Sequence, residues 1–133
     1  MKRRRPRLVV VDDDPTQLGL LERGLTIEGF HVETREGPIG LTNLIRTFRP
    51  AIVLVDVYIP TLRGDRIVEL VRGVADPETK YFLISAYTES ELRLRATGTN
   101  VHGWLSKSLS MSEIGRRLKE SLLEPSPRQA VAR

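Results

Sequence analysis

The chain alternates short apolar runs with longer stretches in which apolar residues recur at helical spacing. Residues 8–11, 51–55 and 80–84 are apolar at nearly every position, which is typical of strands buried on both faces of a parallel sheet. Residues 30–34 alternate apolar and polar side chains, which predicts a strand at a sheet edge with one exposed side. Residues 101–105 complete a set of five predicted strands.

The stretches that separate and follow these strands predict five amphipathic helices. They cover residues 15–28, 39–48, 65–74, 88–97 and 111–122. The fourth has the thinnest apolar face, little more than Leu92 and Ala96. Glu89–Arg93 and Glu91–Arg95 have the spacing of favourable ion pairs on its surface, so we expect that helix to depend on tertiary contacts.

Local signals mark the ends of the first and last helices. Asp14 precedes Pro15, which predicts an N-cap followed by proline at the first helical position. Gly29 stands where a helix C-terminus calls for a left-handed residue. Ser110 and Glu113 have the spacing of a capping box at the start of the last helix.

Strand and helix alternate five times, and this alternation predicts the fold class. Right-handed crossovers then require a parallel sheet with helices on both faces. We expect an α/β, flavodoxin-like (βα)5 doubly wound sandwich whose five-stranded parallel sheet has the order 2-1-3-4-5. In that order the first and third strands are neighbours at the centre of the sheet.

Acidic residues follow both of these central strands. Asp56 ends the apolar run 51–55, and Asp12, Asp13 and Asp14 follow the run 8–11. Ligands bind at the carboxyl ends of strands in open α/β sheets, although Asp56 alone could equally cap its loop. Three adjacent carboxylates repel one another, and a bound cation is the simplest explanation for them. With Asp14 assigned to the helix cap, Asp12 and Asp13 remain for a metal.

These residues belong to a longer set of motifs, each at the end of a predicted strand. The set comprises VVDDDP at residues 10–15, Asp56, Pro60 and Gly64 spaced as D-x-x-x-P-x-x-x-G, Ser85 followed by Ala86, and Lys107. In this order and spacing, residues 7–123 resemble the response regulator receiver domains of two-component signalling, the CheY-like superfamily. We therefore divide the chain into a basic arm (1–6), a receiver domain (7–123) and a tail (124–133).

The resemblance implies a site for phosphoryl transfer. It makes Asp56 the phosphoacceptor and implies Mg²⁺ or Mn²⁺ held directly by Asp13 and Asp56, through water by Asp12, and by the backbone carbonyl of Tyr58. Ser85 and Lys107 are then the donors to the phosphoryl oxygens. The protein would be a phosphoacceptor rather than an enzyme with a separate substrate, beyond self-phosphorylation from small donors and self-dephosphorylation.

Two positions depart from the family pattern. Most relatives have a proline after the site lysine, joined to it by a cis bond, whereas Ser108 follows Lys107 here. A cis bond without proline costs about 3 kcal/mol, so the sequence leaves open whether this bond is cis or is trans with a different loop shape. The aromatic switch position holds Trp104 instead of tyrosine or phenylalanine, and Trp104 could alternatively pack on the thin fourth helix.

Two tyrosines occupy positions that flank the path of the hydrolytic water in receivers. Tyr58 and Tyr87 are therefore candidates for a lid that slows loss of the phosphoryl group, or else they are exposed surface rings. Ser85 and Trp104 are the expected switch residues.

The resemblance also implies partners. The phosphoryl donor would be a histidine kinase or phosphotransfer protein, and a downstream protein would bind the fourth helix, fifth strand and fifth helix, a surface through which receivers also form homodimers. No helix pair typical of DNA-binding domains follows the domain, so we expect a single-domain protein whose output depends on protein binding. A pseudo-receiver that binds partners without phosphorylation is the alternative. A metal-dependent phosphatase or nucleotide-binding enzyme is disfavoured because no glycine-rich phosphate loop is present.

Composition adds constraints on location and charge. The net charge of +4 comes from the N-terminal arm, since residues 8–133 carry 16 basic against 17 acidic side chains. Such an arm can contact nucleic acid or anionic lipid, but a solvated arm is the simpler interpretation. Cysteine is absent, and no apolar run approaches the roughly 18 residues needed to span a bilayer. These features predict a cytoplasmic protein that is not bound to a membrane.

Overall fold

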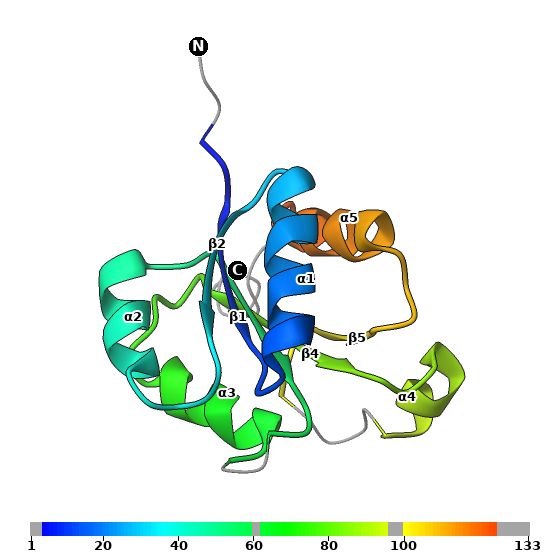
Figure 1. The fold of residues 1–133 in the computed structure, drawn as a ribbon. Helices are drawn as coiled ribbons and strands as arrows, with labels where there is room; N and C mark the ends of the chain where they lie inside the picture. Colours follow the sequence, from blue (N-terminus) through cyan, green and yellow to red (C-terminus); the bar gives the residue numbers. More distant parts are fainter. Residues whose placement is uncertain (1–3, 60–61, 96–99, 125–133) are drawn as a thin grey trace.

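A computed structural model describes residues 4–59, 62–95 and 100–124 as one five-stranded parallel sheet between layers of helices (Figure 1). The strand order is β2-β1-β3-β4-β5, so the predicted fold class and strand order are confirmed. The strands are β1 (Arg7–Val11), β2 (His31–Arg35), β3 (Ile52–Asp56), β4 (Lys80–Ser85) and β5 (Gly103–Ser106). The helices are α1 (Pro15–Ile27), α2 (Leu41–Phe48), α3 (Gly64–Arg72), α4 (Glu89–Arg95) and α5 (Met111–Ser121).

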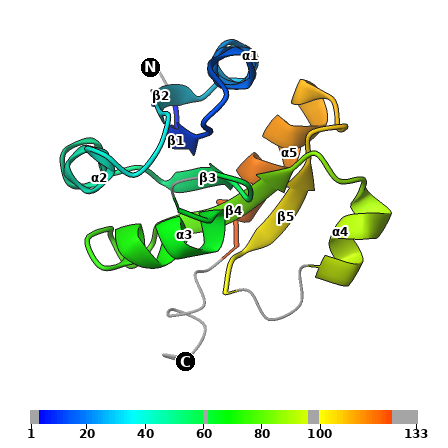
Figure 2. The same ribbon diagram turned by 60° about the horizontal axis from the view of Figure 1, so that its bottom comes forward.

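The sheet separates two hydrophobic cores. Helices α1 and α5 cover one face and α2 and α3 the other, while α4 lies beside β5 (Figure 2). Successive residues of β1 point into different cores: Leu8 and Val10 pack with α1 and α5, and Val9 and Val11 pack with α2 and α3. The continuous apolar runs predicted from the sequence are therefore strands buried on both faces.

Strand β5 begins at Gly103 rather than at residue 101, and α3 ends at Arg72 rather than at residue 74. Two other predicted boundaries are displaced for local reasons. The edge strand β2 begins at His31, because Phe30 is fully buried and its N–H bonds to the carbonyl of Leu25 at the end of α1 (3.0 Å). Helix α2 begins at Leu41 rather than Ile39, because its N-cap Gly40 has a left-handed φ of 75°, which ends helical geometry there. Ile39 is consequently 92% exposed.

The predicted N-caps Asp14 and Ser110 and the left-handed glycine after α1 are confirmed, while the return bond of a capping box from Glu113 stays a prediction. The Asp14 carboxylate accepts the N–H groups of Thr16 and Gln17, and Gly29 follows α1 with a φ of 105°. Ser110 Oγ accepts the N–H of Glu113 at the start of α5 (3.1 Å).

The fourth helix is held partly by an ion pair that the sequence pattern did not suggest. Glu89 of α4 pairs with Arg117 of α5 (2.7 Å), and Arg117 also contacts Glu113 (2.8 Å). Hydrogen bonds from Arg116 and Arg117 lower the pKa of Glu113 to about 2. Residues 96 and 97 and the side chains of Arg93 and Arg95 lie outside the described part of the chain, so the predicted surface pairs of α4 do as well.

Lys80 is buried at the start of β4, where apolar and aromatic residues follow it up to Ser85. Its ammonium donates to the carbonyls of Ser121 and Glu124, at the C-terminal end of α5. A cation there satisfies carbonyls that the helix itself leaves unbonded and interacts favourably with the helix dipole. Lys80 thus fixes the end of α5 to the sheet.

None of the helices described is long and apolar enough to cross a membrane.

His102 extends the pairing of β4 and β5 with its side chain. Its backbone N–H donates to the carbonyl of Tyr81 (2.8 Å), and its Nδ1 accepts the Tyr81 N–H (3.0 Å). Burial, followed by the charges of Lys80 and Arg72, lowers the pKa of His102. Folding therefore favours the neutral imidazole over the charged one.

This preference predicts a pH dependence of stability. The unfolded chain binds a proton on this histidine near pH 6.5, whereas the folded chain does so only at lower pH, so the free energy of unfolding falls as pH drops below about 6.5. His102→Asn keeps an acceptor oxygen but does not titrate, so its stability should fall less between pH 7 and pH 5. Urea unfolding at both pH values measures the difference, with His31 present in both proteins. Equal losses in wild type and variant would contradict the prediction.

Candidate functional site

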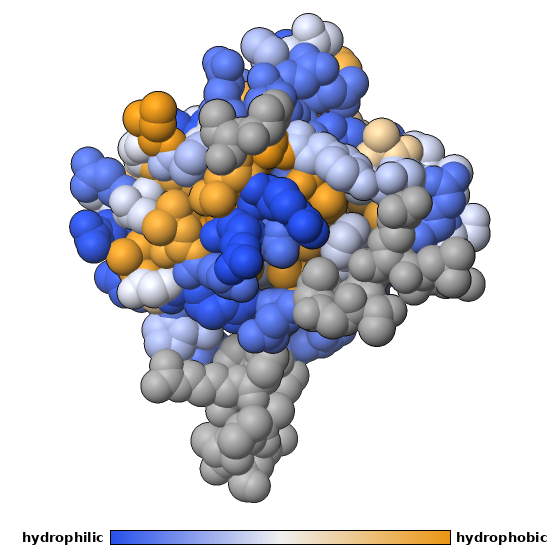
Figure 3. All heavy atoms as spheres, turned by 90° about the horizontal axis from the view of Figure 1, so that it is seen from below, coloured by the Kyte–Doolittle hydropathy of each residue, from blue (hydrophilic) through white to orange (hydrophobic). Residues whose placement is uncertain are grey.

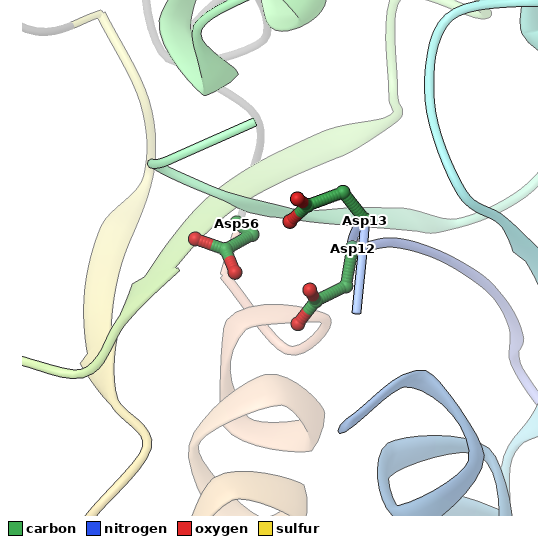
Figure 4. Close-up of side chains that lie close together, drawn as sticks. All are labelled: Asp12, Asp13 and Asp56. Carbon is green, nitrogen blue, oxygen red and sulfur yellow. The ribbon is translucent and has the colours of Figure 1, made fainter. Parts of the chain in front are cut away.

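The carboxyl ends of the strands form one end of the molecule, and Figure 3 shows that end face-on. Hydrophilic residues occupy the middle of this face and hydrophobic residues border them. Val11 of β1 is in register with Val55 of β3, so the next residue of each strand, Asp12 and Asp56, emerges at the same place. Figure 4 shows Asp12, Asp13 and Asp56 converging, with carboxylate oxygens within 4.8 Å of one another.

Backbone N–H groups orient the two buried carboxylates. Asp12 is fully buried, and its Oδ1 accepts the N–H of Asp14 (3.0 Å). Asp56 is 6% exposed, and its Oδ1 accepts the N–H of Tyr58 (2.9 Å). Each therefore keeps Oδ2 for other partners. Asp13 is exposed.

Gly64 allows α3 to begin directly against the backbone at Asp56 and Val57. A Cβ on Gly64 would lie 3.1 Å from the carbonyl carbon of Asp56 and from Cα of Val57, and closer still to the Asp56 carbonyl oxygen. Backbone atoms cannot move aside as a flexible side chain can. The glycine of the D-x-x-x-P-x-x-x-G motif is therefore required by close approach, while Pro60 of that motif lies outside the described residues.

Lys107 joins the two buried carboxylates. Its Nζ lies 2.9 Å from Oδ2 of Asp12 and 2.7 Å from Oδ2 of Asp56. Burial alone would lower the pKa of Lys107, but the hydrogen bonds to Asp12 and Asp56 and the charges of both outweigh it and raise the pKa. Burial, aided by the nearby charge of Asp56, raises the pKa of Asp12 against the hydrogen bonds from Lys107 and Asp14.

The side chains present fit a divalent cation. Three carboxylates and one ammonium leave a net charge of −2 when all are ionised. The donors are all oxygens, which Mg²⁺ and Mn²⁺ prefer over softer metals. The backbone of Tyr58 lies at the same place through its bond to Asp56, and the ligand role of its carbonyl stays a prediction.

Ser85 ends β4 next to this cluster. Its neighbour Ile84 is in register with Asp56, and Ser85 itself is fully buried. Its Oγ accepts the N–H of Tyr87 (3.2 Å), which leaves its proton for an acceptor.

The two tyrosines and the tryptophan are brought together beside the site. The hydroxyls of Tyr58 and Tyr87 are 2.8 Å apart, and their rings meet edge to face at 5.8 Å between centroids. A cavity of about 440 Å³ is lined by Val57, Tyr58, Arg63, Tyr87 and Trp104. Trp104 is partly buried and packs against the core beneath α2 and α3. The roles of lid and switch stay predictions, and the sequence did not point to Arg63.

The segment around Lys107, from Ser106 to Ser108, contains hydrogen bonds that the sequence did not predict. Described residues include no cis peptide bond, so Lys107–Ser108 is trans, which the sequence had left open. Ser106 Oγ donates to the carbonyl of Tyr87 (2.5 Å) and lies 2.7 Å from Ser108 Oγ. Serines on both sides of Lys107 were the only sign of these hydrogen bonds in the sequence. The partners of their hydroxyls depend on loop conformations that the sequence does not give.

Comparison with known proteins identifies the family of this chain. A family model described as the response regulator receiver domain matches residues 8–119. The transcriptional regulatory protein PrrA of Mycobacterium leprae (strain TN) is 33% identical over 118 residues, 88% of this chain and 50% of that protein. The response regulator MprA of Mycobacterium sp. (strain KMS) is 27% identical over 121 residues, 91% of this chain and 52% of that protein.

Solved structures share the fold. The crystal structure of a CheY-like response regulator receiver domain protein from Methanospirillum hungatei JF-1 has a TM-score of 0.74 at 21% identity and covers 88% of this chain and 93% of its own. This chain spans about half the length of the curated relatives it matches. The expectation that no DNA-binding domain accompanies it is therefore not supported. Because the family model spans most of the sequence, the chain belongs to the response regulator receiver domain family.

Proposed function

We propose that this receiver domain accepts a phosphoryl group on Asp56 from a phosphohistidine of a histidine kinase or phosphotransfer protein, in a Mg²⁺-dependent reaction. The observation that carries the proposal is the contact of Lys107 Nζ with both Asp12 and Asp56 inside a cluster of three carboxylates. A pseudo-receiver needs no such concentration of charge, which costs stability unless it is used.

The nucleophile is Asp56 Oδ2. Oδ1 accepts the Tyr58 N–H, and Oδ2, which contacts the Lys107 ammonium rather than the backbone, is the oxygen that we assign to the attack on phosphorus. A bond forms between Oδ2 and phosphorus as the bond from phosphorus to the imidazole nitrogen breaks, and the electron pair stays on that nitrogen. Mg²⁺, when bound by the carboxylates, supplies positive charge that offsets the charge of the phosphoryl oxygens.

Lys107 and Ser85 bind the transferred group. The Lys107 ammonium already contacts Oδ2 of Asp56, so a phosphoryl group added there comes within reach of the same cation. The buried hydroxyl of Ser85 has a proton to donate, since its Oγ accepts from Tyr87. The chain thus acts on its own carboxylate and transforms no separate substrate.

The output is a changed protein-binding surface on α4, β5 and α5, used for a downstream protein or a second copy of the chain. The ion pair between Glu89 and Arg117 supports this part of the proposal, because it links α4 to α5 across that surface. We place this function in the cytoplasm, without a membrane contact.

The first prediction concerns the phosphoacceptor. After incubation with a small phosphodonor and Mg²⁺, wild type should gain the mass of one phosphoryl group and Asp56→Asn should gain none, because the amide is no nucleophile. Asp76→Asn is the matched control, since Asp76 pairs with Arg49 away from the cluster and its variant should be phosphorylated. Intact-mass spectrometry provides the measurement. An unchanged wild-type mass, with metal shown to bind, would establish the pseudo-receiver instead.

The second prediction concerns charge repulsion in the metal-free protein. Lys107 contacts Asp12 and Asp56, whereas Asp13 has no ion-pair partner within the described ranges. Asp13→Asn should therefore raise the melting temperature without metal, by roughly 1–4 °C, and weaken Mg²⁺ binding. Thermal unfolding with and without Mg²⁺ tests both effects, and added Mg²⁺ should stabilise wild type more than the variant. A lower melting temperature of the metal-free variant would contradict the repulsion.

The third prediction concerns the lifetime of the phosphorylated state. The hydroxyl contact between Tyr58 and Tyr87 supports a lid that water must displace, and a barrier of about 1.4 kcal/mol slows hydrolysis tenfold. Replacing both tyrosines with serine should accelerate dephosphorylation while Mg²⁺ affinity is unchanged. Replacing both with phenylalanine keeps the rings and removes the hydroxyl contact, so it separates ring bulk from hydrogen bonding. Equal decay rates in wild type and the double serine variant would remove the lid.

A further inference from the structure

We propose that Ser106 and Ser108 form a hydroxyl brace that positions Lys107 for phosphoryl transfer. The two serines flank Lys107, and Ser108 stands where most receivers have proline. Proline has no N–H to donate. The brace is therefore available to this chain because of its departure from the family pattern, and the inference rests on the proposed function of the site.

The hydrogen-bonding capacity of Ser106 is completely used. A hydroxyl has one proton and two lone pairs. Ser106 Oγ donates its proton to the carbonyl of Tyr87 (2.5 Å) and accepts the N–H of Ser108 (3.1 Å). With that proton engaged, Ser108 Oγ must be the donor in the 2.7 Å contact between the two hydroxyls. One buried atom thus joins the residue after Lys107 to the β4–α4 loop.

The backbone of Lys107 is fixed from the other side as well. Its N–H donates to the carbonyl of Ser85 (2.7 Å), and Ser85 is in register with Ser106 in the sheet. Ser106 is fully buried, whereas Ser108 is exposed. The short segment that carries Lys107 is therefore bonded at three successive residues.

The same bonds connect the lysine to the residues that face the phosphoryl group. Tyr87 accepts from Ser106 through its carbonyl, donates to Ser85 Oγ through its N–H, and meets Tyr58 through its hydroxyl. Lys107 has a flexible four-carbon side chain, so the direction of its ammonium depends on how well its backbone is held. A displacement of about 1 Å in such a group can cost about a hundredfold in rate. Ser106 and Ser108 act through Lys107 and are positioning residues.

Phosphorylation kinetics provide one test. Ser106→Ala should slow phosphorylation by a small phosphodonor about tenfold to a hundredfold at saturating Mg²⁺, with Mg²⁺ affinity unchanged because the carboxylates are intact. Ser108→Ala removes one bond at an exposed position and should slow it about two- to tenfold. Ser106→Thr keeps the hydroxyl and should restore most of the rate. Ser112→Ala, an exposed serine in the first turn of α5, should match wild type.

A double-substitution cycle separates positioning from a general structural effect. If Ser106 acts through Lys107, Ser106→Ala should slow the reaction much less in a Lys107→Ala background than in wild type. Equal losses in the two backgrounds would overturn the brace.

Chemical labelling of lysines tests the brace without phosphorylation. The Lys107 side chain is 18% exposed, so loss of the brace should speed its reductive methylation, measured by peptide mass spectrometry. Exposed Lys119 provides the reference rate, and buried Lys80 reports global unfolding. Faster labelling of Lys107 alone in Ser106→Ala supports the brace even if wild type is not phosphorylated, an outcome that would reject only the proposed function. Unchanged labelling of Lys107, or an equal rise at Lys80, would overturn the brace.

Discussion

The structure depends on how negative charge is accommodated at the carboxyl ends of β1 and β3. Burial of the Asp12 carboxylate is costly unless a cation and hydrogen-bond donors offset the lost hydration. Lys107 provides the cation and the Asp14 N–H provides a donor, and Lys107 also contacts Asp56. The remaining net charge of −2 is suited to a divalent cation. The tight loop at Gly64 and the bonds around Lys107 hold these charges at short range.

Much of the fold could be predicted because it depends on patterns within short segments. Continuous apolar runs identified the buried strands, and the right-handed crossovers predicted a parallel sheet with helices on both faces. The strand order was that of the known flavodoxin-like fold. Asp12, Asp13 and Asp56 could be placed together because strand ends meet at one edge of a parallel sheet.

The rest depends on contacts between distant segments. The start of α2 depends on the left-handed conformation of Gly40, which the apolar spacing does not encode. Glu89 pairs with Arg117 on α5, a contact between helices that the spacing of charges within α4 does not encode. The Ser106 hydroxyl bonds to a carbonyl 19 positions earlier in the chain, and only the loop conformations bring the two together. Side chains of this kind have several partners within reach, so the sequence alone does not choose among them.

Polar residues at the two ends of the sheet have different roles, stabilising the fold at one end and forming the candidate site at the other. At the amino end, the Lys80 ammonium bonds carbonyls at and just after the end of α5, and His102 Nδ1 bonds the backbone of β4, so these atoms stabilise the fold. At the carboxyl end, Ser106 and Trp104 are two residues apart on β5, and residues so spaced point to the same face of a sheet. Ser106 bonds the Tyr87 backbone, and Trp104 lines a cavity with the Tyr87 ring. A movement of the β4–α4 loop toward a phosphoryl group would therefore displace both the hydroxyl brace and Trp104. Trp104 is larger than the tyrosine or phenylalanine usual at the switch position, but it is not the only residue that connects Asp56 with the proposed partner surface. The hydroxyls of Ser106 and Ser108 form a second connection from the site to β5.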